Sequence, residues 1–524
     1  MGQLRATIWA AIRSREGAIT LLTIAGVFSA VQSATPSIIG IDGYYHIRVA
    51  ALMREHGPRL DFPWLQLTIL NPARYADHHF LFHALQVPFT FGDLRTGAKM
   101  ASVLFATLGL YISYLFLAGS KVRYPVFWLL VMLAASQTFL WRQSMARPQG
   151  LFLALMVLGT WASLSNRPWL LIPIGWAAAW TFDGFPFILA MPLASVGALV
   201  ALWLISRPSN ALREQWRLIG ANRRPALLAC TAAALGIGLG LVTHPYFPRH
   251  FEFAMLHLLP KAQVGIELDV RVGGEWYPFP WSGFPQRVGP SIVLCALGLI
   301  PPAFQLWRRH LPDWRGVALG GLALGLLGMT IRSQRIIEYL PPFAAFFCAW
   351  GWSRGDLPIP TLLVPPFRLV SRWAVPLLCV GVFAGLLWTV MQARRDARGA
   401  FAWDLPRGAA EWLVANTPPG SRVFFPAFDD FPRLFYWDTH NTYLVGLDPT
   451  YMTLYDPQLF ALWRQVAQGR VASPSGPIQE VFGASYVYTQ RSRAAFVSSV
   501  TADPRFEMVH STSNTLVFRL RPAS

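Results

Sequence analysis

Cysteine is scarce in this chain: the four present all lie inside apolar stretches, at Cys230, Cys295, Cys348 and Cys379. Cysteines placed in this way are typical of small core hydrophobes rather than of disulfides or metal ligands. The sequence also has no Walker-type phosphate loop and no Gly-x-Ser-x-Gly elbow, so ATP hydrolysis and serine hydrolase chemistry are unsupported. No internal repeat is evident either, which disfavours a transporter built from inverted repeats.

Charge is low as well, because only 13% of the residues are charged while 54% are hydrophobic, which argues against a soluble globule. The hydrophobic residues come in blocks of roughly 15–22 residues, long enough as helices to cross a bilayer core. The first block follows Arg5, Arg13 and Arg15 as a signal peptide would, but no clean cleavage site follows it, so we expect a retained helix. We predict an α-helical polytopic membrane protein of about 11–13 transmembrane helices, with spans near 17–35, 98–118, 125–141, 150–165, 169–181, 185–206, 226–243, 288–307, 317–331, 337–353 and 374–393.

The basic residues indicate how these helices are oriented. The net charge of +18 could suggest a nucleic-acid partner, but the arginines and lysines lie in short loops between the apolar blocks. With a cytoplasmic N-terminus and alternating sides, nearly every inner loop is basic, as the positive-inside rule requires. The acidic, histidine and aromatic residues gather instead in outer segments, which include the loops 36–97 and 244–287 and the C-terminal part of the chain. We therefore expect no nucleic acid, and any chemistry on the extracytoplasmic face of a bacterial-type inner membrane.

The composition changes near residue 394, which predicts two domains, a transmembrane domain at 1–393 and an extracytoplasmic (periplasmic) α/β domain at 394–524. Amphipathic helical patterns at 408–416 and 458–468 alternate there with short apolar runs. The runs that predict strands are 422–425, 442–446, 485–488 and 515–520.

Asp42 opens the first candidate site, because it directly follows the first helix and precedes Gly43, Tyr44, Tyr45 and His46. A carboxylate at the membrane surface beside aromatic rings can hold a divalent cation or orient a nucleophile. The alternative is an interfacial aromatic belt with one solvated acid.

Further polar residues lie in the same outer segments. Asp77 and His78 are followed by His79 and His83, whose i, i+4 spacing suits a metal site, or an interfacial histidine pair. Asp183 lies close to the membrane, where an acid is a functional candidate unless it caps the next helix. Four arginines lie on the outer side, where the positive-inside rule does not favour basic residues: Arg142, Arg147, Arg332 and Arg335. Their guanidinium groups can bind phosphate or pyrophosphate. The alternative is that these side chains extend along the membrane surface to reach water.

Together, four short stretches resemble the catalytic subunit of oligosaccharyltransferase, a polytopic glycosyltransferase of the GT-C type. The first-loop stretch Asp42–Arg48 (DGYYHIR) is similar to the family's Asp followed by aromatics and Arg. The stretch Trp180–Ile188 (WTFDGFPFI) looks like the family's Trp-Gly-Gly-Tyr-x-Phe segment, and Glu411–Pro418 (EWLVANTP) is similar to its Trp-Leu-x-x-Asn-Thr-Pro. Phe428–Pro432 (FDDFP) follows where the family has Trp-Trp-Asp-Tyr-Gly.

The resemblance implies an inverting glycosyltransferase that moves a sugar or oligosaccharide from a polyprenyl phosphate or pyrophosphate carrier to a protein acceptor, as a single-subunit enzyme. It implies catalytic roles for Asp42 and for Glu275, which lies where the family has the loop glutamate that bridges acceptor and active site. It also implies donor-phosphate binding by Arg332 and Arg335, a role that we also expect for the outer arginines Arg142 and Arg147. A cofactor cation, Mg²⁺ or Mn²⁺, would be held by Asp42. The acceptor would be bound by Tyr44, Tyr45, His46, Asp429 and Asp430.

The sequence departs from the family in two places. The second outer loop reads Ser144–Gln149 (SMARPQ) where the family has an acidic pair. Either the cation is held with help from Asp77, His78 or Asp183, or the enzyme works without one. Both tryptophans of the C-terminal signature are absent, which leaves open a GT-C enzyme that uses a polyprenyl-phosphate monosaccharide and a glycan or lipid acceptor. A non-enzymatic transporter or assembly protein is the other alternative.

Overall fold

The computed structural model describes residues 9–263, 274–354 and 365–521. The chain divides into two compact units, each built from segments that are distant in the sequence. Unit 1 comprises Met1–Thr35, Ala101–Thr243 and Glu275–Gly399. Unit 2 comprises Pro36–Met100, His244–Gly274 and Ala400–Ser524. We predicted that the transmembrane domain ends at residue 393, and this boundary stays a prediction.

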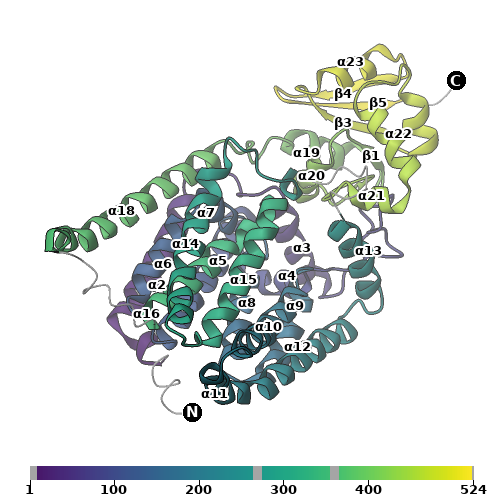
Figure 1. Ribbon diagram of the computed structural model, residues 1–524. Helices are drawn as coiled ribbons and strands as arrows, with labels where there is room; N and C mark the ends of the chain where they lie inside the picture. The colour runs from purple at the N-terminus through teal and green to yellow at the C-terminus, as the bar shows by residue number, and fades with distance from the viewer. Residues whose placement is uncertain (1–8, 264–273, 355–364, 522–524) are drawn as a thin grey trace. The chain divides into compact units, whose positions relative to one another are not determined.

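Unit 1 is formed by helices (Figure 1). They are α2 (Arg15–Gln32), α5 (Leu94–Gly119, which starts in unit 2), α6 (Pro125–Ala134), α7 (Gln137–Gln143), α8 (Gln149–Leu164), α9 (Leu171–Thr181), α10 (Phe187–Ser206), α11 (Asn210–Ile219), α12 (Arg223–Thr243), α14 (Phe284–Trp307), α15 (Trp314–Arg332), α16 (Leu340–Arg354) and α18 (Pro365–Arg398).

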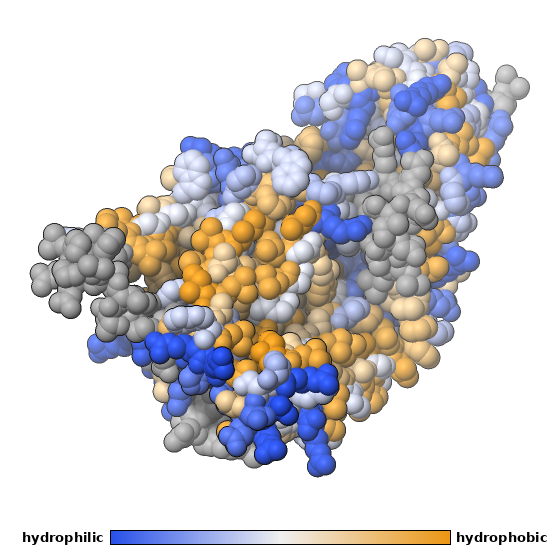
Figure 2. All heavy atoms as spheres, in the orientation of Figure 1, coloured by the Kyte–Doolittle hydropathy of each residue, from blue (hydrophilic) through white to orange (hydrophobic). Residues whose placement is uncertain are grey.

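The apolar helices confirm a multi-pass membrane protein. Among the described residues, six helices are long and apolar enough to cross a bilayer, or seven if the bent pair α6 and α7 is one span. This number is below the predicted 11–13 because several expected spans, such as α8, α9 and α16, form helices of only 11–16 residues. Figure 2 shows hydrophobic residues over much of the visible side of these helices, with hydrophilic residues gathered near the end where α11 lies.

Small residues set the distance between neighbouring helices. A Cβ added at Gly236 of α12 would lie 2.3 Å from the carbonyl oxygen of Ile172 in α9. A Cβ at Gly175 of α9 would in turn lie 2.9 Å from the backbone nitrogen of Ile237. Because neither position has a side chain, the two backbones touch directly, as is common between membrane helices.

A sharp break separates α6 from α7, which meet at an angle of 94°. The hydroxyl of Ser136 accepts a hydrogen bond from the amide of Phe139 and caps the N-terminus of α7. The stretch predicted as one span at 125–141 is therefore two helices. The short second helix carries Arg142.

Unit 2 combines helices with a five-stranded sheet in the order β2-β1-β3-β5-β4. β1 is parallel to β2 and β3, whereas the pairs β3–β5 and β4–β5 are antiparallel. The strands are β1 (Arg422–Phe424), β2 (Thr442–Tyr443), β3 (Tyr486–Gln490), β4 (Phe506–Ser511) and β5 (Thr515–Leu520). The helices are α3 (Asp42–His56), α4 (Phe80–Gln86), α13 (Arg249–Gln263), α19 (Arg407–Asn416), α20 (Phe431–Trp437), α21 (Thr450–Tyr455), α22 (Pro457–Ala467) and α23 (Ala494–Ala502).

The first outer segment is bonded to this C-terminal sheet. The amide of Tyr443 in β2 donates to the carbonyl of Trp64 over 2.7 Å, and the amide of Gln66 donates to the carbonyl of Tyr443 over 3.3 Å. Leu65 thereby pairs in parallel with Tyr443 and covers the edge of the sheet that β2 would leave open. The segment that contains Asp42 and the C-terminal segment thus form one body.

Candidate functional site

A cluster of ion pairs in unit 1 brings together residues from four places in the sequence. Arg142 lies on α7 and Arg147 in the loop that precedes α8. Glu275 lies on the short 3-10 helix η4 (Gly274–Trp276), and Arg335 and Glu338 lie on another, η5 (Gln334–Glu338). We call these five residues the arginine cluster. Four of them were predicted site residues, and Glu338 was not.

Three guanidinium groups converge on the carboxylate of Glu275. Arg335 donates to its Oε1 over 2.8 Å, while Arg142 and Arg147 donate to its Oε2 over 2.9 and 3.2 Å. Burial by itself raises the pKa of Glu275, but the charges of Arg335, Arg142 and Arg147 outweigh burial and hold that pKa well below its ordinary value. Glu275 is therefore ionised and fully paired, rather than poised as a proton acceptor.

Glu338 anchors the other side of the cluster. Its Oε1 accepts a hydrogen bond from Nε of Arg142 over 2.6 Å and lies 2.5 Å from Nη2 of the same guanidinium as an ion pair. Its backbone carbonyl accepts from Gln143 over 2.8 Å. Its side chain is only 1% exposed. Because Arg142 bonds both Glu338 and Glu275, it bridges the two carboxylates and fixes the geometry of the site.

Aromatic rings and a hydroxyl support the remaining members. The guanidinium of Arg335 lies 5.5 Å from the ring centre of Phe182 and 4.9 Å from that of Trp276, within cation–π range. The hydroxyl of Ser333 donates to the backbone carbonyl of Glu275 over 3.3 Å. These contacts tie η4 and η5 together and orient Arg335 toward Glu275.

The other two candidates of unit 1 lie at helix ends. Arg332 is the last residue of α15 and is exposed. Asp183 is buried in the turn between α9 and α10. The alternative role for Asp183, capping the next helix, is not observed. Pro186 is the N-cap of α10, and no side chain caps that helix.

In unit 2, Asp42 is the half-buried first residue of α3, and Tyr44, Tyr45 and His46 are buried on the same helix. The hydroxyl of Tyr44 accepts from the amide of Ile38 over 3.2 Å. The three predicted acceptor-binding residues that follow Asp42 are therefore packed side chains with defined orientations.

A buried hydrogen-bonded chain runs from α3 to Asp77. Nδ1 of His46 lies 2.8 Å from Nε2 of His83, and Nδ1 of His83 lies 2.7 Å from Oδ2 of Asp77. Burial raises the pKa of Asp77, but the pairing with His83 outweighs it and leaves that pKa below its ordinary value. The i, i+4 spacing of His79 and His83 left a metal site and an interfacial histidine pair open, and sequence reasoning missed the chain that joins His83 to His46 and Asp77.

The predicted metal ligands were tested against these contacts. Over the part of the chain that the structure describes, no group of three or more histidine, cysteine or acidic side chains is placed to hold a metal ion. Both oxygens of Asp77 are engaged, by His83 and by the amide of His79, and the ring of His78 stacks on Phe253. The residues present do not fit a divalent-cation site, and the cation stays a prediction from the sequence.

Asp430 is the second acidic feature of unit 2. It ends the 3-10 helix η6 (Phe428–Asp430), and its Oδ1 accepts from Gln490 over 2.6 Å and from Arg433 over 3.1 Å. Burial raises the pKa of Asp430 to about 6. Its neighbour Asp429 is more exposed and lies 3.8 Å from Arg493. Sequence reasoning missed Arg433 and Gln490.

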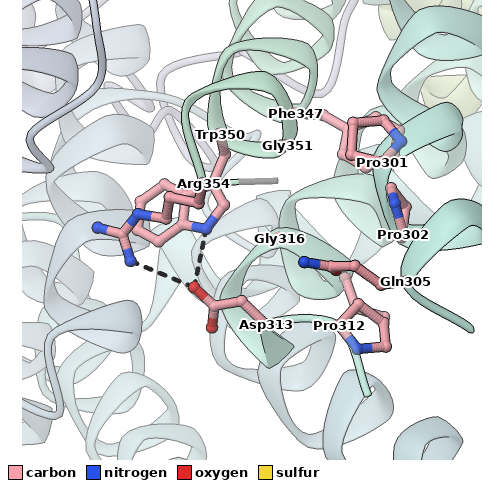
Figure 3. Close-up of a pocket in the computed structure, with 11 residues that line it drawn as sticks. Pro301, Pro302, Gln305, Pro312, Asp313, Gly316, Phe347, Trp350, Gly351 and Arg354 are labelled. Atoms are coloured by element: carbon pink, nitrogen blue, oxygen red, sulfur yellow. Dashed lines mark hydrogen bonds and ion pairs between the residues drawn. The ribbon is translucent and has the colours of Figure 1, made fainter. Parts of the chain in front are cut away.

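A small pocket, open to solvent, lies in unit 1 where α14, α15 and α16 meet, and none of the predicted site residues lines it. The indole of Trp350 and the guanidinium of Arg354 both point at Asp313, to which they donate over 3.0 and 3.2 Å (Figure 3). Pro301, Pro302 and other apolar side chains form much of the remaining wall. The charges of this pocket are thus paired with one another.

Comparison with known proteins gives a likeness of fold. No family model and no curated protein matches the sequence. The archaeal oligosaccharyltransferase AglB from Archaeoglobus fulgidus, solved with an inhibitory peptide and a dolichol-phosphate, is similar with a TM-score of 0.61 and 14% identity, over 98% of this chain and 75% of AglB.

ArnT from Cupriavidus metallidurans is also similar, in the apo state and bound to undecaprenyl phosphate. Both ArnT structures have a TM-score of 0.53, cover 96% of this chain and 97% and 98% of ArnT, and are 13% and 14% identical. This chain therefore has the fold of the GT-C glycosyltransferases, as the resemblance in its motifs predicted.

Proposed function

We propose that this chain is a membrane glycosyltransferase of the GT-C type that takes a sugar or oligosaccharide from a polyprenyl phosphate or pyrophosphate carrier. The observation that carries the proposal is the convergence of Arg142, Arg147 and Arg335 on one point of a protein with this fold. Guanidinium groups bind phosphate oxygens bidentately, and three of them around one anion are a favourable phosphate site. The solved structures with dolichol-phosphate and undecaprenyl phosphate support the same class of donor.

The chemistry requires little from the protein beyond positioning and charge stabilisation. The bond between the anomeric carbon and the phosphate oxygen breaks, and its electron pair leaves with the phosphate. The acceptor's nucleophilic atom attacks the anomeric carbon from the opposite face, so the configuration inverts. In this proposal the arginines stabilise the departing phosphate, and Asp42 orients the nucleophile and takes its proton. No step is assigned to a cation.

The acceptor proposed first is a protein, bound by unit 2 near Tyr44, Tyr45, His46 and the acids Asp429 and Asp430. A second candidate is a glycan or lipid acceptor with a polyprenyl-phosphate monosaccharide donor. The absence of both tryptophans from the C-terminal signature, which reads Phe428–Pro432 (FDDFP), favours this second candidate. We place the reaction on the extracytoplasmic face of a bacterial-type inner membrane, because the basic residues of the inner loops orient the helices in that way.

The test is transfer by the purified full-length protein. The donor is the labelled lipid-linked sugar pool extracted from membranes of the source organism. The products are labelled acceptor and the free carrier, which is polyprenyl phosphate or polyprenyl pyrophosphate according to the donor. We expect Asp42→Asn to lower transfer at least 100-fold, on the order expected for losing a general base. Asp61→Asn, an exposed acid of the same segment, is the matched control and should keep full activity.

Three results would test the function, the role of Asp42 and the cation separately. Failure of the wild type to release polyprenyl phosphate or polyprenyl pyrophosphate would overturn the proposed function. Full activity of Asp42→Asn would overturn the role of Asp42. Loss of transfer in EDTA with recovery in Mg²⁺ or Mn²⁺ would support the predicted cation, and full activity in EDTA would remove it.

A further inference from the structure

The arginine cluster already holds an anion, the carboxylate of Glu275. Three guanidinium groups and two carboxylates leave it with one net positive charge. Buried charges of one sign are costly unless they are paired, so the three arginines need a counter-ion at all times. With Glu338 alone remaining, the cluster would carry two positive charges, which suit a phosphate or pyrophosphate group.

The two carboxylates of the cluster differ in how firmly they are held. Glu338 is 1% exposed, and both its carboxylate and its backbone carbonyl are bonded to α7. The side chain of Glu275 is 23% exposed and projects from a three-residue helical turn. Its backbone carbonyl accepts from Ser333, and its carboxylate accepts from the three arginines. Glu275 is therefore the member whose removal leaves the rest of the cluster in place.

We propose that Glu275 is an exchangeable stand-in for the phosphate of the donor: its carboxylate occupies the arginines in the empty enzyme, and the phosphate of the lipid carrier displaces it. This inference rests on the proposed function, because it names the anion that the arginine cluster takes. Carboxylate and phosphate oxygens use the same N–H donors. The two anions compete for the three guanidinium groups and repel each other, so binding of one excludes the other.

The exchange gives Glu275 a measurable effect on donor affinity. A ligand that must first displace an internal competitor binds only those molecules in which the site is open. Its apparent affinity is therefore its intrinsic affinity multiplied by the fraction of such molecules. Glu275→Gln keeps the size of the side chain but removes its charge, so the amide competes poorly for the arginines. We expect this variant to bind the lipid phosphate on the order of tenfold more tightly than the wild type.

The experiment measures binding of undecaprenyl phosphate to the full-length protein in nanodiscs, by titration with native mass spectrometry. The variants are Glu275→Gln, Arg335→Gln and, as matched control, Glu214→Gln, which changes an exposed glutamate of α11 in the same unit. We expect tighter binding for the first, at least tenfold weaker binding for the second and no change for the third. Glu275→Asp, which keeps the charge on a side chain one methylene shorter, serves as a second variant and should bind with an affinity between those of the wild type and Glu275→Gln.

Two contradicting results are distinguishable. If Glu275→Gln and Glu275→Asp bind undecaprenyl phosphate as the wild type does, or more weakly, while Arg335→Gln still loses binding, the exchange is overturned and the phosphate site stands. If the wild type does not bind undecaprenyl phosphate and Arg335→Gln changes nothing, the proposed function itself fails. In transfer assays the exchange predicts a lower donor KM for Glu275→Gln, whereas a fall in kcat at unchanged KM would assign Glu275 to the chemical step instead.

Discussion

The bridge between Arg142 and Glu338 makes a quantitative prediction about stability. The two side chains are 6% and 1% exposed, and their closest nitrogen–oxygen distance is 2.5 Å, so solvent screens the pair very little. Replacing Arg142 by methionine leaves the carboxylate of Glu338 buried beside a neutral side chain. Breaking a buried pair in this way costs about 3–5 kcal/mol in the free energy of unfolding.

The double variant Arg142→Met/Glu338→Met removes both charges but keeps side chains of similar volume, so it distinguishes the charge interaction from packing. With both charges removed, the desolvation cost of each disappears, and we expect the free energy of unfolding to return to within about 2 kcal/mol of the wild type. The measurement is a double-mutant cycle on the purified full-length protein, unfolded by titration with SDS and followed by tryptophan fluorescence. A coupling energy of about 2 kcal/mol or more is expected, and effects of the two single variants that add within about 0.5 kcal/mol would refute the reasoning.

Two further predictions concern packing in unit 1 and the buried acid of unit 2. Gly236→Ala should destabilise the protein by about 1–3 kcal/mol, because its Cβ would lie 2.3 Å from the carbonyl oxygen of Ile172, whereas Gly238→Ala on the same helix meets no atom within 4 Å and should be neutral in thermal unfolding. Equal melting temperatures for the two variants would contradict the close contact. Burial raises the pKa of Asp430 from 3.8 to about 6, so the folded state binds this proton more tightly than the unfolded state does. The protonated carboxyl therefore adds about 3 kcal/mol to the free energy of unfolding. This contribution is fully present below pH 4 and is lost as the pH rises through 6. Asp430→Asn should flatten the fall in melting temperature between pH 4 and 7, and parallel curves for variant and wild type would exclude this assignment.

Long apolar helices and the central strands were predictable from the sequence because their hydrophobic patterns are strong. The stretches at 98–118, 185–206, 288–307 and 317–331 correspond to α5, α10, α14 and α15. The strand β4 was missed because Phe506–Ser511 is an edge strand whose residues are all partly or fully exposed, so its polar and apolar residues do not alternate cleanly.

The candidate site was predictable only in part, because its contacts join residues far apart in the sequence. Outer arginines pointed to an anion site, and Arg142, Arg147 and Arg335 do meet. That Glu275 fills this site could not be foreseen, since 133 residues separate it from Arg142. Glu338 follows Arg335 by three residues, which only weakly indicated that it belongs to the site. The pairing of Asp430 with Gln490 spans 60 residues, and no sequence pattern indicated it.

We propose the arginine cluster as the site that binds the phosphate of a lipid-linked donor. The most direct measurement is an experimental structure of the full-length protein in a nanodisc with undecaprenyl phosphate bound. We expect the phosphate to lie within hydrogen-bond distance of the guanidinium groups of Arg142, Arg147 and Arg335, with the carboxylate of Glu275 displaced. A bound phosphate elsewhere, with the three arginines still paired to Glu275, would contradict it.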